Sequence, residues 1–165
     1  MHPQAYNFVA RYYTEAPLAV LDLGGRDING SVRTLFPAAD PYVVLDIAPG
    51  DNVDVVADAA TWAPDREFDV VVCCETFEHT KTWPQICSTA FKALRPGGRF
   101  IATMAGPGRP EHSGVDGGWT LHDGEFYGNV RPDVLRAVLT ACGFVRILVD
   151  QQYNPADVRA MAVRP

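Results

Sequence analysis

The chain of 165 residues has no long apolar run, no secretion signal and only four cysteines. No hydrophobic segment approaches the roughly 20 residues that cross a bilayer, so we expect no association with a membrane. Residues 1–16 lack the basic start and apolar core of a secretory leader, which favours a cytoplasmic protein. The cysteines form no CxxC pair, and we expect free, buried thiols at Cys73, Cys74, Cys87 and Cys142.

Basic residues are also fewer than acidic ones, with 14 Lys and Arg against 20 Asp and Glu. The resulting net charge of −6 argues against broad electrostatic binding to DNA or RNA. No repeat, low-complexity tract or interdomain linker interrupts the chain, and its apolar content of 47% is that of a globular protein. We therefore expect residues 1–165 to form a single domain, as a monomer or a homodimer.

What the chain does contain is a regular alternation of strand and helix patterns. Apolar runs predict strands over residues 18–23, 42–46, 53–57, 68–74, 99–104, 144–149 and 158–163. Helical spacing of apolar residues predicts helices over residues 3–13, 31–36, 83–94 and 132–142. This alternation predicts an α/β fold of three layers, with a mostly parallel sheet between helices.

Acidic side chains and a glycine turn stand at the ends of the first three predicted strands. Gly24 and Gly25 follow the first strand, Asp46 ends the second, and Asp58 follows the third. In an open parallel sheet, a glycine turn lets a ligand approach the backbone closely. An acid about 20 residues further on can accept both hydroxyls of a ribose. The pattern therefore predicts a pocket for a nucleoside.

Four phrases in this order resemble the class I S-adenosylmethionine-dependent methyltransferases, a Rossmann-like family. They are Asp22-x-Gly24, Asp46, Asp58-Ala59 and Arg95-Pro96-Gly97-Gly98, and the resemblance extends from about Leu18 to Val163. It implies a seven-stranded sheet whose last strand is antiparallel. It also implies methyl transfer as the activity and S-adenosylmethionine as the cofactor.

The resemblance further implies that the cofactor lies along the strand ends. The two glycines would let the backbone approach its methionine part, Asp46 would take the ribose hydroxyls, and Asp58, Ala59 and Trp62 would border the adenine. The full set of predicted cofactor-binding residues is Asp22, Gly24, Gly25, Arg26, Asp46, Ile47, Asp58, Ala59, Cys74 and Glu75.

Arg26 departs from the DxGxGxG pattern of the family, because it replaces the second spaced glycine. Its side chain either narrows the turn or reaches the carboxylate of the cofactor's methionine. This departure leaves a non-catalytic, partner-dependent cofactor-binding subunit open as an alternative. A dinucleotide-binding protein is disfavoured, since Asp27 would place negative charge against a pyrophosphate.

The phrase Glu75-Thr76-Phe77-Glu78-His79 follows the fourth predicted strand. If the segment is helical, Glu75, Glu78 and His79 share one face and can bind a divalent ion such as Mg or Mn. The ExxEH phrase resembles metal-dependent O-methyltransferases, including enzymes of the ubiquinone pathway and small-RNA ribose methyltransferases. The resemblance implies a further histidine ligand, for which His122 and His112 are available.

Two other interpretations of Glu75, Glu78 and His79 remain open. The acids can cap or orient the local backbone, or His79 can be a general base without metal. We expect all three to be catalytic residues for O-methylation of a small-molecule hydroxyl by direct displacement, and RNA ribose methylation is the alternative. The segment 105–130, with Trp119 among its aromatic residues, is a candidate lid over the site.

Overall fold

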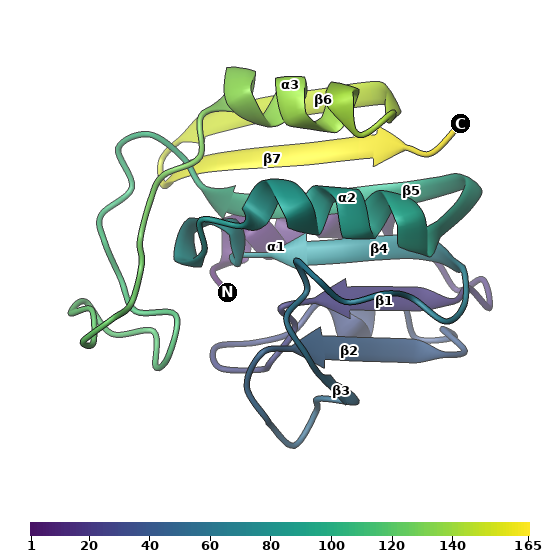
Figure 1. The fold of residues 1–165 in the computed structure, drawn as a ribbon, viewed down its shortest axis with the longest axis horizontal. Coiled ribbons are helices and arrows are strands. Elements are labelled where there is room, and N and C mark those ends of the chain that lie inside the picture. Colours follow the sequence, from purple (N-terminus) through teal and green to yellow (C-terminus); the bar gives the residue numbers. More distant parts are fainter.

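Seven strands form one sheet in the computed structural model, which describes residues 1–165 (Figure 1). In chain order they are β1 (Val20–Leu23), β2 (Tyr42–Asp46), β3 (Val55–Val56), β4 (Phe68–Cys74), β5 (Leu94–Ala105), β6 (Val145–Tyr153) and β7 (Ala156–Val163). Their order across the sheet is β3-β2-β1-β4-β5-β7-β6, and β7 is antiparallel to both of its neighbours. The predicted sheet, mostly parallel with an antiparallel last strand, is confirmed.

Helices cover both faces of this sheet and complete the three predicted layers. α1 (Pro3–Val9) packs on one face, while α2 (Trp83–Ala93) and α3 (Pro132–Ala141) pack on the other (Figure 1). Because side chains alternate along a strand, Cys73 of β4 enters the core beneath α2, and its neighbour Cys74 packs against the core beneath α1. All four cysteines are free thiols, as predicted, although Cys74 and Cys142 are only half-buried.

Several predicted elements are shorter than the sequence patterns indicated. The helix expected over residues 3–13 is α1 followed by a 3₁₀ turn, η1 (Ala10–Tyr12), and the strand expected over residues 18–23 begins at Val20. The helix expected over residues 31–36 is a single 3₁₀ turn, η2 (Arg33–Leu35). The strand expected over residues 53–57 pairs only at Val55–Val56. Next to this short pair, the Asp54 amide donates to the Val44 carbonyl at 2.9 Å, and the Asp54 carboxylate accepts a 2.8 Å hydrogen bond from the Val44 amide.

Three strands are longer than predicted. β6 and β7 extend to a tight turn at Asn154 and Pro155, so the polar loop expected between them is part of a hairpin. β5 begins at Leu94 and includes the residues expected only to end the preceding helix. The reason is long-range pairing, since Gly97 donates to the Arg164 carbonyl at 2.8 Å and the Arg164 amide donates to Gly98 at 3.0 Å.

The segment between β5 and α3 contains no helix or strand, as its composition predicted. It projects from the edge of the sheet at which β1, β2 and β4 end (Figure 1). This edge therefore combines the predicted glycine turn, the strand-end acids and the longest irregular segment. Separately, none of the helices is both long and apolar enough to span a membrane.

Candidate active site

A cavity of about 840 Å³ opens at this edge of the sheet. It is lined by strand ends and the segments that follow β1, β2 and β4, together with residues of the 105–130 segment. His2, just before α1, and Arg109, four residues after β5, also line it. The predicted cofactor residues that line the cavity are Asp22, Gly24, Gly25, Arg26, Asp46, Ile47, Cys74 and Glu75.

The turn after β1 requires both of its glycines. Gly24 has a positive φ of 72°, and a Cβ there would lie 2.3 Å from Thr76 Oγ1. A Cβ on Gly25 would lie 2.5 Å from the Asp22 side chain, which is packed directly below. Burial raises the pKa of Asp22 to about 6, opposed by a 2.8 Å hydrogen bond from the Tyr42 hydroxyl. Asp22 thus supports the shape of the turn from beneath.

Asp46 and Ile47 lie at the end of β2, beside this turn. The Asp46 carboxylate accepts hydrogen bonds from the Arg26 amide at 3.2 Å and the Ala48 amide at 2.9 Å. Because a carboxylate has about four lone-pair positions, it retains capacity for further donors. Ile47 is 74% exposed at the mouth of the cavity, where it offers an apolar surface to a ring.

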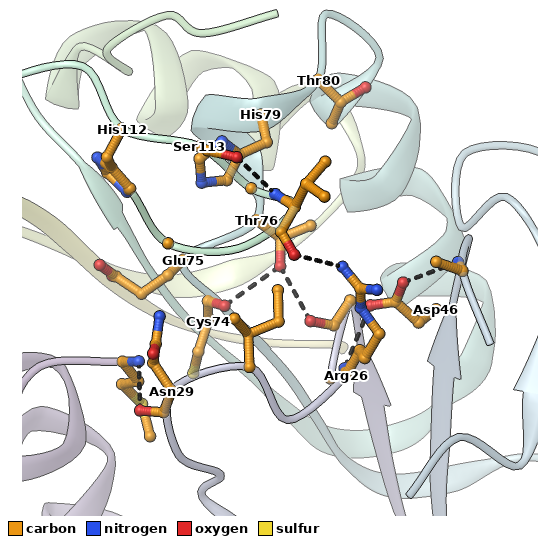
Figure 2. A pocket seen from close by; sticks show the side chains of 18 of the residues that line it. Arg26, Asn29, Asp46, Cys74, Glu75, Thr76, His79, Thr80, His112 and Ser113 are labelled. Carbon is orange, nitrogen blue, oxygen red and sulfur yellow. Dashed lines mark hydrogen bonds between the residues drawn. The ribbon is translucent and has the colours of Figure 1, made fainter. Parts of the chain in front are cut away.

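The Arg26 side chain contacts the 105–130 segment. Its Nη2 donates to the Val115 carbonyl at 3.2 Å, while the side chain stays half-buried (Figure 2). A hydrogen bond to the loop was not among the two roles that the sequence suggested for this arginine. The substitution of glycine by arginine therefore ties the glycine turn to the 105–130 segment.

Three residues expected at the adenine do not line the cavity. Asp58 is exposed, and its carboxylate accepts a 2.8 Å hydrogen bond from the Ala60 amide. Ala59 belongs to the core beneath α2 and α3, and Trp62 packs against that core.

The segment after β4 does not place its two glutamates on one face. Only Phe77–His79 is helical, as the 3₁₀ turn η3, and Glu75 precedes it with a positive φ of 55°. Glu75 is fixed in this uncommon conformation by its amide, which donates to the Thr103 carbonyl at 2.7 Å. Glu75 and Glu78 therefore enter different surroundings.

Glu75 belongs to a group of four charged side chains, His2, Glu75, Arg109 and Asp157, which we term the Glu75 cluster. His2 Nε2 lies 3.1 Å from Glu75 Oε2 and 3.3 Å from Asp157 Oδ1. Arg109 pairs with Asp157 through Nη1, and its Nη2 lies 3.8 Å from Glu75 Oε2. Asp157 is fully buried behind the other three, which line the cavity.

The charges in the Glu75 cluster support one another. Burial opposes protonation of His2, but hydrogen bonds to Asp157 and Glu75 prevail and raise its pKa to about 9. Burial likewise opposes ionisation of Glu75, yet His2 and then Arg109 hold the pKa of this carboxyl below its usual range. At neutral pH the cluster thus contains two cations and two anions.

Glu78 is completely buried and does not line the cavity. Its Oε1 accepts a 3.1 Å hydrogen bond from the Ala105 amide at the end of β5, and its Oε2 has no partner. Burial and then the charge of Glu75 raise the pKa of Glu78 to about 8. Its carboxyl group is therefore mostly protonated at neutral pH, and it joins η3 to the end of β5.

A second group, which we term the His79 group, consists of Glu78, His79, His112 and Tyr127. The rings of His79 and His112 are 5.0 Å apart, and Tyr127 lies 5.7 Å from His79 and 5.0 Å from His112. Burial, followed by His112, lowers the pKa of His79 to about 4, so this imidazole is neutral at pH 7. His79 and His112 both line the cavity (Figure 2).

The predicted metal ligands are only partly brought together. Ligand atoms of Glu78, His79 and His112 lie within 4.8 Å of one another, and Glu78 Oε2 and His79 Nδ1 are buried without partners. A carboxylate and two imidazoles suit a divalent ion. Glu75 instead joins its own cluster, and His122 is 54% exposed, 3.0 Å from the Asp116 carboxylate.

Sequence reasoning did not identify His2, Arg109 or Asp157. None belongs to a motif, and Asp157 lies where an antiparallel strand begins, so no strand-end rule selects it. Arg109 contacts Asp157, which is 48 positions away in the sequence, and His2, which is 107 positions away. No local signal in the sequence could have indicated these contacts.

The fold is that of the class I S-adenosylmethionine-dependent methyltransferases. Residues 4–148 match the family model described as a methyltransferase domain, and the chain belongs to that family. The predicted family is therefore confirmed. The matched residues include the whole cavity wall contributed by the strand ends and the 105–130 segment.

Solved structures with the same fold carry the predicted cofactor. The 1,6-didemethyltoxoflavin-N1-methyltransferase of Burkholderia thailandensis, solved with S-adenosylhomocysteine, has a TM-score of 0.72 and 14% identity, over 98% of this chain and 77% of that one. Phosphoethanolamine N-methyltransferase 2 of Haemonchus contortus, solved with S-adenosylmethionine, has a TM-score of 0.69 and 15% identity, over 99% and 53%. These structures, solved with S-adenosylmethionine or S-adenosylhomocysteine, confirm the predicted cofactor, S-adenosylmethionine.

A curated relative shares more sequence over a shorter region. Phosphoethanolamine N-methyltransferase 1 of Zea mays is 34% identical over 82 residues, which are 46% of this chain and 16% of the maize protein. The chain thus matches a small part of that relative's length.

Proposed function

We propose that this domain, residues 1–165, transfers a methyl group from S-adenosylmethionine to a small-molecule acceptor held in the same cavity. The observation that carries the proposal is that one cavity of about 840 Å³ is lined both by the glycine turn with Asp46 and by His79. The first group suits the methyl donor, and the second provides a neutral imidazole. A volume of this size is within the range of about 300–1,000 Å³ typical of small-ligand sites, so donor and acceptor can share it.

The donor lies along the strand ends in this proposal. Asp46 accepts the ribose hydroxyls with its remaining lone pairs, and exposed Ile47 contacts the adenine. Gly24 and Gly25 leave the backbone uncovered beside the methionine part. Cys74 lies between these groups and Glu75 (Figure 2) and packs against the donor as a neutral thiol, because burial raises the pKa of Cys74.

The acceptor is a hydroxyl group next to His79. The methyl carbon bonds to the acceptor oxygen as its bond to sulfur breaks, and the electron pair stays on sulfur. The hydroxyl proton passes to His79, whose side chain lines the cavity and whose imidazole is neutral at pH 7. Most of the acceleration comes from holding the two reactants in line.

An amine acceptor is the second candidate, and the names of the relatives favour it. The maize and Haemonchus proteins are phosphoethanolamine N-methyltransferases, and the Burkholderia enzyme is an N1-methyltransferase. A neutral amine needs no base to attack the methyl group. Changing His79 to alanine should therefore lower turnover about 100-fold with a hydroxyl acceptor and much less with an amine.

A divalent metal at Glu78, His79 and His112 remains a prediction. It would polarise a hydroxyl acceptor and ease loss of its proton. Turnover that persists in a chelator and in a Glu78→Gln variant would argue against the metal. Metal dependence together with an RNA acceptor would favour the ribose methyltransferase alternative, which the net charge of −6 disfavours. The cytoplasmic location and the monomeric or homodimeric state also remain predictions.

Calorimetric titration with S-adenosylmethionine and S-adenosylhomocysteine, with and without Mn²⁺ or Mg²⁺, tests the proposal. We expect micromolar binding to the wild-type chain. An Asp46→Ala variant should bind each ligand about 10 to 100-fold more weakly, since charged hydrogen bonds to the ribose are lost. The matched control is Asp58→Ala, outside the cavity, which should bind normally. Absence of binding to the wild type would contradict the proposal and favour a partner-dependent subunit.

A further inference from the structure

The cavity contains a part that the donor residues and His79 do not account for. Two segments line this part, the one between η3 and α2 and the 105–130 segment, through Thr80, Lys81, Thr82, Trp119, Glu125 and Phe126. Figure 2 places Thr80 next to His79 and on the other side of the view from Asp46. A donor whose ribose is bound at Asp46 therefore leaves these residues to the acceptor.

Lys81 supplies a cation in this part of the cavity. Its ammonium lies over the ring of Phe126, 5.3 Å from the ring centroid, and it forms no ion pair. Phe126 is kept beside η3, because the Gly128 amide donates to the Glu78 carbonyl at 2.8 Å. A cation over an aromatic ring is held in place, yet its ammonium hydrogens stay free for an acceptor. The cavity thus has unused charged donors two residues from His79.

Position distinguishes Lys81 from the other cations of the cavity lining. The Met1 ammonium donates to the Asn29 carbonyl at 2.7 Å, and Arg26 donates to the Val115 carbonyl at 3.2 Å, both beside the glycine turn. The remaining two belong to the Glu75 cluster at the end of β4. All four border the proposed donor, whereas Lys81 follows His79.

The carboxylates nearest to this part of the cavity do not neutralise Lys81. Glu125 accepts three hydrogen bonds from its own segment. Glu78 is mostly protonated at neutral pH, and Glu75 is paired within its own cluster. The donor would add a second positive charge, its sulfonium, to the same cavity. Opposite charges attract strongly where solvent is partly excluded, so an anionic acceptor fits better than a neutral or cationic one.

An uncovered aromatic side chain lies in the same part of the cavity. Trp119 is 77% exposed, lines the cavity and stacks on no other ring, and Phe126 presents a second, half-buried ring. An indole gains free energy when an apolar or aromatic surface covers it, and its N–H can still reach a polar partner. The anionic group should therefore be attached to an apolar body.

We propose that the methyl acceptor is an organic anion whose carboxylate or phosphate binds Lys81 and whose apolar body packs against Trp119 and Phe126. Lys81 then determines specificity for the acceptor. Thr80 and Thr82 support it, because their hydroxyls are hydrogen-bonded to each other at 2.7 Å and one of the two protons stays available to the anion. The assignment rests on the proposed function, since it requires methyl transfer in this cavity.

NMR titration with four small probes tests the charge and the apolar body separately. The probes are benzoate, benzamide, phenyl phosphate and inorganic phosphate, added to the chain saturated with S-adenosylhomocysteine. The indole N–H signal of Trp119, assigned with a Trp119→Phe variant, reports binding. Benzoate or phenyl phosphate should bind about fivefold more tightly than benzamide, which has the shape of benzoate without its charge. Inorganic phosphate should bind more weakly than phenyl phosphate, because it lacks the ring.

Substitution of Lys81 should abolish the preference for charge. A Lys81→Gln variant should bind the preferred anionic probe about fivefold more weakly and benzamide normally, and Lys81→Arg should recover most of the loss. Raising NaCl from about 0.1 to about 0.5 M should reduce the preference in the wild type. The matched control is Lys92→Gln, the other lysine of the chain, which is exposed near the end of α2 and outside the cavity lining. It should bind every probe as the wild type does.

Calorimetry with S-adenosylhomocysteine separates this inference from the proposed function. The Lys81→Gln variant should bind it as the wild type does, and a weaker affinity would assign Lys81 to the donor instead. Donor binding with equal affinities for benzoate, phenyl phosphate and benzamide, or with no shift of the Trp119 signal by any probe, would refute the inference alone. Equal affinities for inorganic and phenyl phosphate would refute the contact with Trp119. A wild-type chain that does not bind the donor would refute the proposed function and the inference with it.

Discussion

The Glu75 cluster and the His79 group lie at neighbouring parts of one cavity and differ in charge. The side chains of the first are ionised at neutral pH, whereas Glu78 and His79 of the second are mostly neutral. Glu75 and Glu78 are three residues apart, yet ion pairs hold the pKa of Glu75 down while burial raises that of Glu78 to about 8. His2 and His79 differ in the same manner, with pKa values of about 9 and about 4. Opposite charges nearby determine the first region, and loss of solvent determines the second. One cavity thereby has a charged group of side chains and a neutral one in its wall.

Removing Arg109, the central cation of the Glu75 cluster, should have the largest effect on the stability of the fold. An Arg109→Ala substitution leaves Asp157 and Glu75 buried with only His2 between them, and we expect a loss of about 3–5 kcal/mol in the free energy of unfolding. Denaturant titration measures it. The control is Arg131→Ala, whose partner Asp133 is 65% exposed, where the loss should stay below about 1 kcal/mol. Equal effects at the two sites would mean that the cluster contributes no more than a surface pair.

The neutral region should reveal itself in the pH dependence of stability. The pKa of Glu78 is higher in the folded chain than in the unfolded one, so the folded state keeps a proton that the unfolded state releases. Stability should therefore fall as the pH rises from the unfolded pKa toward about 8, by up to about 1.4 kcal/mol per pH unit.

A Glu78→Gln variant should lose this slope and become the more stable protein near pH 8. Thermal or denaturant unfolding across the range gives the result. Glu75→Gln serves as the comparison, with the opposite sign. The pKa of Glu75 is lowered, so the contribution of this carboxylate is present at neutral pH and lost as the pH falls. Parallel pH profiles in the two variants would contradict the distinction between the regions.

A smaller effect should follow when the loop is released from the glycine turn. Arg26→Ala removes the hydrogen bond to Val115, worth about 1 kcal/mol, from the segment that supplies His112. Limited proteolysis within residues 105–130 should become about fivefold faster, and the pKa of His2 measured by NMR should not change. If cleavage is unaffected, other contacts hold this segment.

The smallest effect should come from His122, the metal ligand that the sequence suggested. It is 54% exposed and pairs with Asp116 outside both regions. A His122→Ala variant should retain unfolding free energy within about 0.5 kcal/mol and unchanged donor affinity. His112→Ala provides the contrast in a Mn²⁺ titration, since only His112 lies beside Glu78 and His79. A loss of Mn²⁺ binding in the His122 variant would restore the predicted ligand.

The sheet and the glycine turn could be predicted because their signals are local. β4 is an unbroken apolar run, and Gly24 is required by a positive φ within its own turn. The separation of Glu75 from Glu78 could not be predicted, because it depends on one left-handed residue before η3 where a helix was assumed. Arg109 and Asp157 were missed for a different reason. Their roles arise only when β7 is paired beside β5, and the sequence does not state which residues then face each other.

The direction of β7 has a consequence for how the pocket is encoded. The parallel strands deliver their last residues to the cavity, whereas β7 runs the other way and places one of its first, Asp157, opposite Ala105 and behind the residues that line the cavity. The pairing of β7 with β5 therefore sets the position of this carboxylate. A shift of one residue in this pairing would bring Ala156 or Val158 opposite Ala105, with its side chain on the other face of the sheet. A charge next to the cavity thus depends on the register of a strand that contributes no residue to the cavity lining.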